Sequence, residues 1–244
     1  MSVAALVLAA GRGERLGGAL SKAFVPLAGK ALVVHALEAL AASAEIDLVI
    51  PVIARGDLRR WADLQSQLAP IPKLAEPALG GAERQDSMAA GLAALPAGVS
   101  HVAVHDAARP LVRPEDVERV VRAAKRDGAA ILAAPVRDTI KRVRGGRVVE
   151  TPERSECFAA QTPQVFRLEI LREALMKAEV DAFVGTDDAQ IVEALGVAVT
   201  VVDGDVENFK VTRASDLAAA ERVLRARGEA ERAPGARGKG SGAA

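Results

Sequence analysis

The feature that most constrains the fold of this chain is a regular alternation of apolar, strand-length runs with segments of helical period. This order is typical of a parallel sheet whose strands are connected by helices. The predicted strands are 3–10, 47–53, 101–106, 130–135 and 197–202, and the predicted helices are 31–42, 57–68, 84–95, 114–127 and 215–227. We therefore expect an α/β fold, with a Rossmann-like, open, mostly parallel sheet and helices on both faces.

One segment departs from this alternation. Residues 139–143 and 147–151 flank Gly145-Gly146, a pair typical of a tight hairpin turn. Both flanking segments are polar and charged, so the hairpin is predicted to project from the sheet as an arm over about 138–156. A contact with a second subunit and a solvent-exposed ribbon are both compatible with this pattern.

The domain organisation predicted from the sequence is simple. One domain is expected over residues 1–228. The composition of the last residues, 229–244, shifts to Ala, Gly, Arg, Glu and Pro. Such a segment contains too little apolar surface to fold, so a disordered tail is predicted there.

Composition excludes several classes of partner. Lys plus Arg equals Asp plus Glu at 32 each, so no global basic field attracts nucleic acid or an anionic membrane. No apolar stretch approaches the roughly 18 residues that a membrane span needs. The single cysteine, Cys157, cannot form an internal disulfide, which fits a reducing compartment. We expect a cytoplasmic protein that binds neither nucleic acid nor membrane.

A glycine-rich turn follows the first predicted strand, and Lys22 comes shortly after it. Small residues let the backbone approach a nucleotide, and free N–H groups in such a turn can bind phosphate oxygens. Arg15 and Lys22 add positive charge suited to a triphosphate. Leu16 stands where the dinucleotide-binding motif G-x-G-x-x-G/A needs a glycine or alanine. The spacing of the Walker A motif, G-x-x-x-x-G-K-[ST], is also absent. The turn is therefore a phosphate loop of another kind or an ordinary strand-to-helix turn.

Two further clusters occupy positions where open α/β sheets bind ligands. Asp106 lies at the carboxyl end of a predicted strand and is suited to orient a substrate hydroxyl or to act near Mg²⁺, while Arg109 is suited to bind a phosphate. A local ion pair between these two residues is the structural alternative. The segment 80–87 places glycines before a helix start, where N–H donors and the Ser87 hydroxyl can contact a base. An ordinary helix start also explains that segment.

The remaining polar residues are less specific. Asp187 and Asp188 are interpreted as charges at a helix N-terminus. Lys210 lies between apolar neighbours in an extended stretch, which is unusual for a merely solvated charge. The three histidines do not have the spacing of metal ligands, so no metal-binding residue is assigned.

Together these segments resemble the 2-C-methyl-D-erythritol 4-phosphate cytidylyltransferases of the non-mevalonate isoprenoid pathway, over roughly residues 3–226. The order and spacing of the motifs make the resemblance specific. The motifs are Leu8-Ala9-Ala10-Gly11-x-Gly13-x-Arg15 with Lys22, Gly81-x-x-Arg84-x-x-Ser87, His105-Asp106-Ala107-Ala108-Arg109-Pro110, Pro135-Val136-x-Asp138-Thr139, Thr162-Pro163-Gln164, Thr186-Asp187-Asp188 and Asn208-x-Lys210-Val211-Thr212.

The resemblance implies a magnesium-dependent nucleotidyltransferase that moves CMP from CTP to 2-C-methyl-D-erythritol 4-phosphate and releases pyrophosphate. It implies a homodimer whose hairpin arms embrace, with Arg154 reaching the neighbouring subunit's substrate. The implied catalytic residues are Arg15 and Lys22; the implied nucleotide-binding residues are Ala9, Ala10, Gly11, Gly81, Ser87, Asp106 and Ala107; and the implied acceptor-binding residues are Asp106, Arg109, Thr139, Arg154, Thr162 and Lys210.

Two departures from the family pattern and two alternative functions remain. Ser21 stands where the family usually has proline before the lysine, followed by Ala23-Phe24, and Ala189-Gln190 stands where Ala-Ser is common. A ribitol 5-phosphate cytidylyltransferase would share the CTP half of the site. A non-catalytic nucleotide-binding regulator would bind CTP without releasing pyrophosphate.

Overall fold

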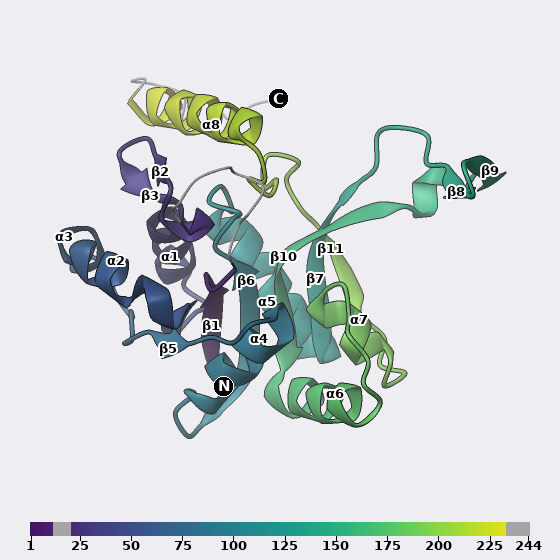
Figure 1. Ribbon diagram of the computed structural model, residues 1–244, viewed down its shortest axis with the longest axis horizontal. Coiled ribbons are helices and arrows are strands. Elements are labelled where there is room, and N and C mark those ends of the chain that lie inside the picture. The colour runs from purple at the N-terminus through teal and green to yellow at the C-terminus, as the bar shows by residue number, and fades with distance from the viewer. Residues whose placement is uncertain (12–20, 233–244) are drawn as a thin grey trace, which may run out of the picture.

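The core of the protein is a mostly parallel sheet (Figure 1). The computed structural model describes residues 1–11 and 21–232. Seven of the described strands form this sheet in the order β11-β7-β10-β6-β1-β4-β5, and only β10 runs antiparallel to its neighbours, β6 and β7. The strands are β1 (Ser2–Leu8), β4 (Leu48–Ile53), β5 (Ala78–Leu79), β6 (Val99–Asp106), β7 (Ala129–Pro135), β10 (Phe158–Arg167) and β11 (Thr200–Asp203).

Helices cover both faces of the sheet because alternate side chains of each strand point to opposite faces. On β1, Val3, Ala5 and Val7 belong to one buried cluster, whereas Leu6 and Leu8 belong to another. The first cluster is covered by α1 (Leu32–Ala42), α2 (Leu58–Asp63), α3 (Gln65–Leu68) and α5 (Pro114–Asp127), and the second by α4 (Arg84–Ala93), α6 (Leu168–Val180) and α7 (Asp188–Glu193). The expected fold class is therefore confirmed.

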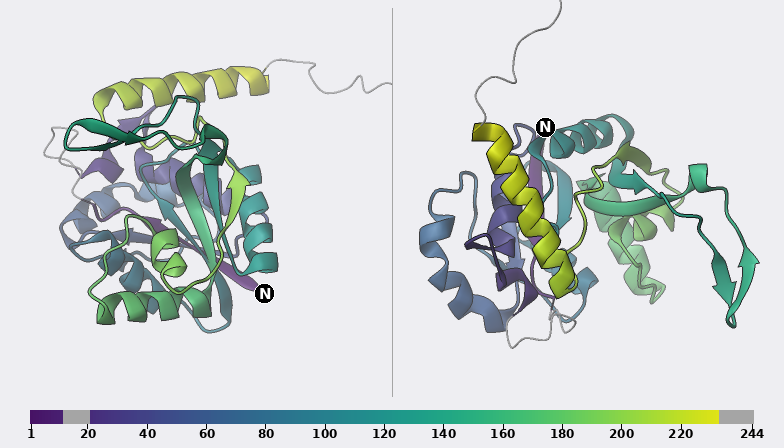
Figure 2. Two further views of the ribbon diagram at one scale, coloured as in Figure 1. Left: turned by 90° about the vertical axis from the view of Figure 1, so that its right-hand side faces the viewer. Right: turned by 90° about the horizontal axis from the view of Figure 1, so that it is seen from above.

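The hairpin arm is present and projects from the body of the protein (Figures 1 and 2). It consists of β8 (Arg142–Arg144) and β9 (Arg147–Glu150), which pair with each other and with no other described strand. Gly145 and Gly146 both have positive φ, 56° and 75°, as the turn between the strands requires. Val143 and Val148 on the arm are more than half exposed.

A separate helix, α8 (Ala214–Arg232), lies outside the two layers that sandwich the sheet (Figure 1). Its buried residue Ala220 packs with Leu27 of the short strand β2 (Pro26–Leu27), which pairs with β3 (Lys30–Ala31). The helix extends past the expected end at Arg227 through residues 228–232. The rest of the predicted tail, 233–244, lies outside the described residues.

Some elements differ from the sequence-based expectations. The predicted helix 57–68 is divided at Leu64 into α2 and α3. The strand β10 and the helix α6 follow the arm in a region where no element was predicted. Pro163 and buried polar residues interrupt the apolar pattern of β10, which explains why periodicity does not reveal it.

No helix within residues 1–11 and 21–232 is long and apolar enough to cross a membrane.

Candidate active site

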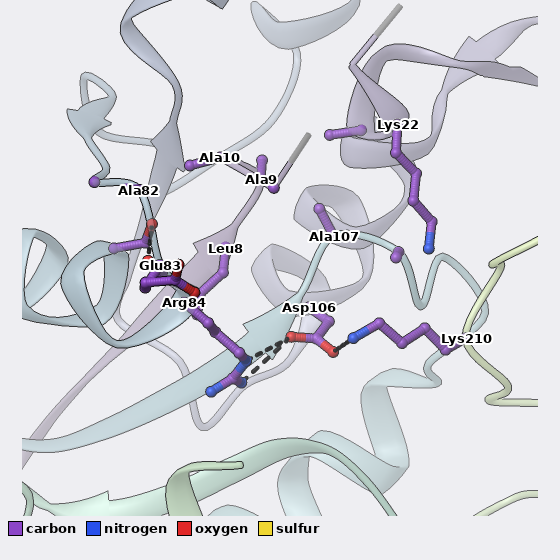
Figure 3. A pocket seen from close by; sticks show the side chains of 15 residues that line it. Leu8, Ala9, Ala10, Lys22, Ala82, Glu83, Arg84, Asp106, Ala107 and Lys210 are labelled. Carbon is purple, nitrogen blue, oxygen red and sulfur yellow. Dashed lines mark hydrogen bonds and ion pairs between the residues drawn. The ribbon is translucent and has the colours of Figure 1, made fainter. Parts of the chain in front are cut away.

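A cavity of about 250 Å³ opens beyond the carboxyl ends of β1 and β6 (Figure 3). This is the edge at which parallel α/β sheets bind ligands, because neighbouring strands end there and loops diverge. The cavity is lined by Leu8, Ala9, Ala10, Gly11, Lys22, Ala23, Gly81, Ala82, Glu83, Arg84, Ser87, Asp106, Ala107, Ala108 and Lys210. Segments that are far apart in the sequence therefore meet at one site.

The predicted nucleotide-binding residues all line this cavity. The backbone behind them is fixed, since the Ala9 N–H donates to Val52 O at 2.8 Å and the Ala107 N–H donates to Leu8 O at 3.0 Å. Gly80 packs so closely that a Cβ atom there would lie 2.7 Å from both Ala10 Cβ and Ser87 Oγ. A glycine at position 80 is thus needed for the loop before α4 to close against the loop after β1.

Only one of the two predicted catalytic residues, Lys22, is among the described residues. Arg15 lies outside the described residues. Lys22 lines the cavity and begins a short 3₁₀ helix, Lys22–Phe24. Ala23 and Phe24, which depart from the family pattern, are both buried in the core. Their burial anchors the backbone that carries Lys22.

Asp106 is the electrostatic centre of the cavity, and Arg84 and Lys210 approach it from opposite sides (Figure 3). Lys210 Nζ lies 2.7 Å from Asp106 Oδ2, and Arg84 Nε and Nη2 each lie 3.3 Å from Oδ1. Burial opposes ionisation of Asp106, but the two cations outweigh it and hold the pKa of its carboxyl below the usual range. Asp106 is therefore a carboxylate at neutral pH, and its ion pair with Lys210 holds that side chain beside it.

Arg84 is a site residue to which the sequence assigned no role. It also donates to Asp188, which is buried at the start of α7. Burial lowers the tendency of Arg84 to be charged, but Asp188 and Asp106 outweigh it and raise the pKa of Arg84 above its usual value. The interpretation of Asp188 as a simple helix-terminal charge is wrong, because its side chain is 2% exposed and faces Arg84. Asp187 does cap α7, accepting from the Gln190 N–H.

The position of Arg84 follows from the way α4 begins. Glu83 and Asp86 form a capping box in which each side chain accepts from the other residue's backbone N–H. This fixes the first turn of the helix, and Arg84 extends from it toward β6. The sequence signals for this role were the position of Arg84 at the start of a predicted helix and its place in the motif Gly81-x-x-Arg84-x-x-Ser87.

Three predicted acceptor residues share one buried network. The Thr162 hydroxyl accepts from the Asp106 N–H at 3.1 Å and pairs with His105 Nδ1 at 2.9 Å. His105 Nε2 contacts Arg109 O at 3.1 Å. The Arg109 guanidinium donates to Asn208 O and Ala160 O. The Arg109 N–H donates to Asp106 O at 2.9 Å, but among the described residues the ion-pair partners of the Asp106 carboxylate are Arg84 and Lys210, so the alternative of a local Asp106–Arg109 ion pair is not found. Burial lowers the pKa of Arg109.

Besides Lys210, two more predicted acceptor residues, Thr139 and Arg154, lie at the base of the arm. Thr139 is exposed between β7 and β8, and Arg154 is exposed on the 3₁₀ helix Arg154–Glu156. Arg154 Nη1 donates to Arg137 O at 3.2 Å. Neither lines the cavity of its own chain. Arg109 and Thr162 do not line the cavity either, but they are hydrogen-bonded to residues at or next to it, Thr162 to Asp106 and Arg109 to Asn208.

The described side chains around the cavity do not form a set of metal ligands. Among the described residues, no group of three or more His, Cys, Asp or Glu side chains could hold a metal ion. Both oxygens of Asp106 are engaged by cations. The cavity therefore fits a cation that enters on a phosphate ligand better than one bound by the protein alone.

Comparison with known proteins gives one consistent family. Residues 3–226 match the family model described as "IspD: 2-C-methyl-D-erythritol 4-phosphate cytidylyltransferase". The chain is 44% identical over 226 residues to the protein of that name from Pelotomaculum thermopropionicum, covering 92% of this chain and 95% of that one.

Two solved structures show the same agreement. The 2-C-methyl-D-erythritol 4-phosphate cytidylyltransferase from Thermus thermophilus is 35% identical, with a TM-score of 0.75 and coverage of 92% of this chain and all of that one. The 4-diphosphocytidyl-2C-methyl-D-erythritol synthase from Anaerococcus prevotii is 27% identical, with a TM-score of 0.82 and coverage of 92% and 96%.

Proposed function

The chain belongs to the 2-C-methyl-D-erythritol 4-phosphate cytidylyltransferase family, and we propose how its own residues perform the reaction of that family. The enzyme transfers CMP from CTP to 2-C-methyl-D-erythritol 4-phosphate in the non-mevalonate pathway. A phosphate oxygen of the acceptor forms a bond to the α-phosphorus of CTP, the bond between that phosphorus and the α–β bridging oxygen breaks, and pyrophosphate leaves. The reaction needs no covalent enzyme intermediate.

The nucleotide half of the site is built from backbone and small side chains. Ala9, Ala10 and Gly11 present a backbone that a ribose and base can approach, and Gly81 and Ser87 form the facing wall. Ala107 lies beside them at the end of β6. Small residues leave room for the nucleoside. Because position 80 is a glycine, the segment with Gly81 and Ser87 can pack closely against Ala10, and this close packing fixes the orientation of the nucleoside.

The chemical difficulty is that both reactants are anions, so positive charge and positioning must lower the barrier. Lys22 lines the cavity at the start of the 3₁₀ helix Lys22–Phe24, and Arg15 precedes it by seven residues in the sequence. We assign both to the triphosphate, where they stabilise charge that develops as pyrophosphate departs. In-line attack then requires the acceptor phosphate to lie on the opposite side of the α-phosphorus.

The acceptor half is assigned to Asp106, Lys210, Arg109 and Thr162. Lys210 has a side chain that is 43% exposed, so it can offer its charge to an acceptor anion while it remains near Asp106. The carboxylate of Asp106 is suited to accept a hydrogen bond from an acceptor or ribose hydroxyl. Arg109 and Thr162 lie in the network directly behind it.

Mg²⁺ is assigned to the substrate, as the Mg²⁺ complex of CTP, because the described residues offer no cage for it. The ion would neutralise part of the triphosphate charge. Chelation with EDTA should abolish pyrophosphate release, and added Mg²⁺ should restore it. Full activity in EDTA would contradict this assignment.

A homodimer is proposed because Thr139 and Arg154 lie on an exposed arm rather than at the cavity of their own chain. Each arm would deliver these residues to the neighbouring subunit. Mixing Lys22→Ala and Arg154→Ala variants tests this: a mixed dimer contains one site with both residues intact, so activity should reappear. If the mixture stays inactive although subunits exchange, the shared site is wrong.

A cytoplasmic location is also proposed, and it is supported by the single cysteine, which permits no internal disulfide. Fractionation of cells with an antibody against the chain would test it. Recovery of the chain outside the cytoplasmic fraction would contradict it.

The observation that carries the proposed site is the convergence of Lys22, Asp106 and Lys210 on one cavity, together with the small residues of the loop after β1. The decisive experiment measures pyrophosphate release with CTP and Mg²⁺, with and without the acceptor. Release should require 2-C-methyl-D-erythritol 4-phosphate, and ribitol 5-phosphate should replace it poorly. Equal rates with ribitol 5-phosphate would contradict the assignment of 2-C-methyl-D-erythritol 4-phosphate as the acceptor. Binding of CTP without release of pyrophosphate would indicate a non-catalytic regulator.

A further inference from the structure

The helix α8 packs behind the site through a small apolar cluster that is distinct from the two clusters of the sheet. We name it the rear cluster; its buried members are Leu27, Leu32, Leu111, Val211 and Ala220. Leu27 follows the segment of Lys22, Leu111 comes two residues after Arg109, and Val211 is adjacent to Lys210. The rear cluster therefore connects the three segments that carry Lys22, Arg109 and Lys210, the cations assigned to the two substrates.

Polar contacts from α8 fix the Lys210 segment at both of its ends. Arg227 donates to Leu111 O at 2.9 Å and to Glu207 Oε2 at 3.0 Å. At the other end, Asp216 Oδ2 accepts from the Thr212 N–H at 2.7 Å and from the Arg213 N–H at 2.8 Å. A rigid helix thus holds residues 207–213 as a bridge, with Lys210 in its middle.

The bridge is connected to Arg109 as well. The Arg109 guanidinium donates to Asn208 O at 2.8 Å, and the Val211 N–H donates to Ala108 O at 2.8 Å. The Asn208 side chain donates to Thr162 O at 3.0 Å. A displacement of the 207–213 bridge would therefore move Lys210 and Arg109 together. Most of the residues assigned to the nucleotide, those of 9–11 and 81–87, lie in other segments.

From this arrangement we infer that Arg227 is a positioning residue for the acceptor: through Glu207 and Leu111 O it sets where Lys210 and Arg109 meet the acceptor phosphate. The inference rests on the proposed function. Arg227 lies one residue past the last residue that the family model matches. It does not touch the cavity, and its effect passes through the bridge.

The test varies each substrate separately in steady-state kinetics on the full chain. Arg227→Met keeps much of the side-chain length and removes the donors, and it should raise the KM for 2-C-methyl-D-erythritol 4-phosphate on the order of 10-fold, because small misplacements of binding groups are costly. The KM for CTP should change less than about twofold by the same reasoning. Arg225→Met, at an exposed position of the same helix, is the matched control and should change neither constant.

Arg227→Lys should recover part of the acceptor KM, since an ammonium group can still donate to one of the two oxygens. If Arg227→Met does not fold, Glu207→Gln replaces it; that variant removes the charge and keeps the shape, and the same KM should rise by a smaller factor. An unchanged acceptor KM, or equal increases for both substrates, overturns the inference. A wild-type chain that releases no pyrophosphate with CTP and the acceptor overturns the proposed function itself.

Discussion

Acidification should destabilise this protein through one histidine, His105. Its side chain is fully buried, and burial lowers its pKa from 6.5 to about 4. Nε2 contacts Arg109 O, so it carries the hydrogen of the neutral ring, and Nδ1 is left to accept from the Thr162 hydroxyl. Protonation would have to occur at Nδ1, where it would disrupt the bond to Thr162.

The sign and size of the effect follow from linkage. Between pH 6.5 and about 4 the unfolded chain binds a proton that the folded chain rejects, so stability falls as the pH falls through this window. A shift of one pKa unit corresponds to about 1.4 kcal/mol, which gives roughly 3 kcal/mol for the full window. About 2 kcal/mol of this should already be lost between pH 7.5 and pH 5.0.

Urea unfolding at pH 7.5 and pH 5.0, for the wild type and for His105→Gln, measures this contribution. The variant should be less stable at pH 7.5, by about 1–3 kcal/mol, because a buried hydrogen bond is lost. Its further loss on acidification should be smaller than that of the wild type by about 2 kcal/mol. Other groups, such as the buried Asp188, cancel in this difference. If the variant lost as much stability on acidification as the wild type, His105 would not be the source.

Three further outcomes are expected. Lys22→Ala should lower kcat about 10²- to 10³-fold with an unchanged circular dichroism spectrum, and a near-normal kcat would remove Lys22 from the mechanism. Arg109→Ala and Lys210→Ala should chiefly raise the KM for the acceptor, which kinetics with each substrate varied separately would detect; an effect confined to CTP would reverse the assignment. Asp188→Asn should cost about 3 kcal/mol in urea unfolding because it breaks the buried pair with Arg84, and a loss below about 1 kcal/mol would show that Asp106 alone holds Arg84.

The part of the site that could be predicted from the sequence is the part set by strand ends. Asp106 and the loop after β1 follow apolar runs that pattern alone identifies, and parallel strands bring their carboxyl ends to one edge. Lys210 was conspicuous because a charge between apolar neighbours in an extended stretch is hard to explain by solvation. Its pairing with Asp106 across 104 residues of sequence could not be derived locally.

The contacts that the sequence did not predict depend on tertiary packing. Arg84 and Asp188 come from helices on the same face of the sheet, and only the folded chain shows that one guanidinium bridges two carboxylates. The same is true of β10, where Gln161, Thr162 and Gln164 are buried because partners elsewhere satisfy them. Local periodicity treats such buried polar residues as loop.

The reversed direction of β10 determines where the arm is rooted. The chain leaves the sheet at the carboxyl end of β7 and, because β10 runs the opposite way, re-enters at that same rim. Both stems of the arm therefore leave the same edge of the sheet at which β1 and β6 end. Lengthening or shortening the hairpin would alter what projects from that edge and leave every strand register in the sheet as it is.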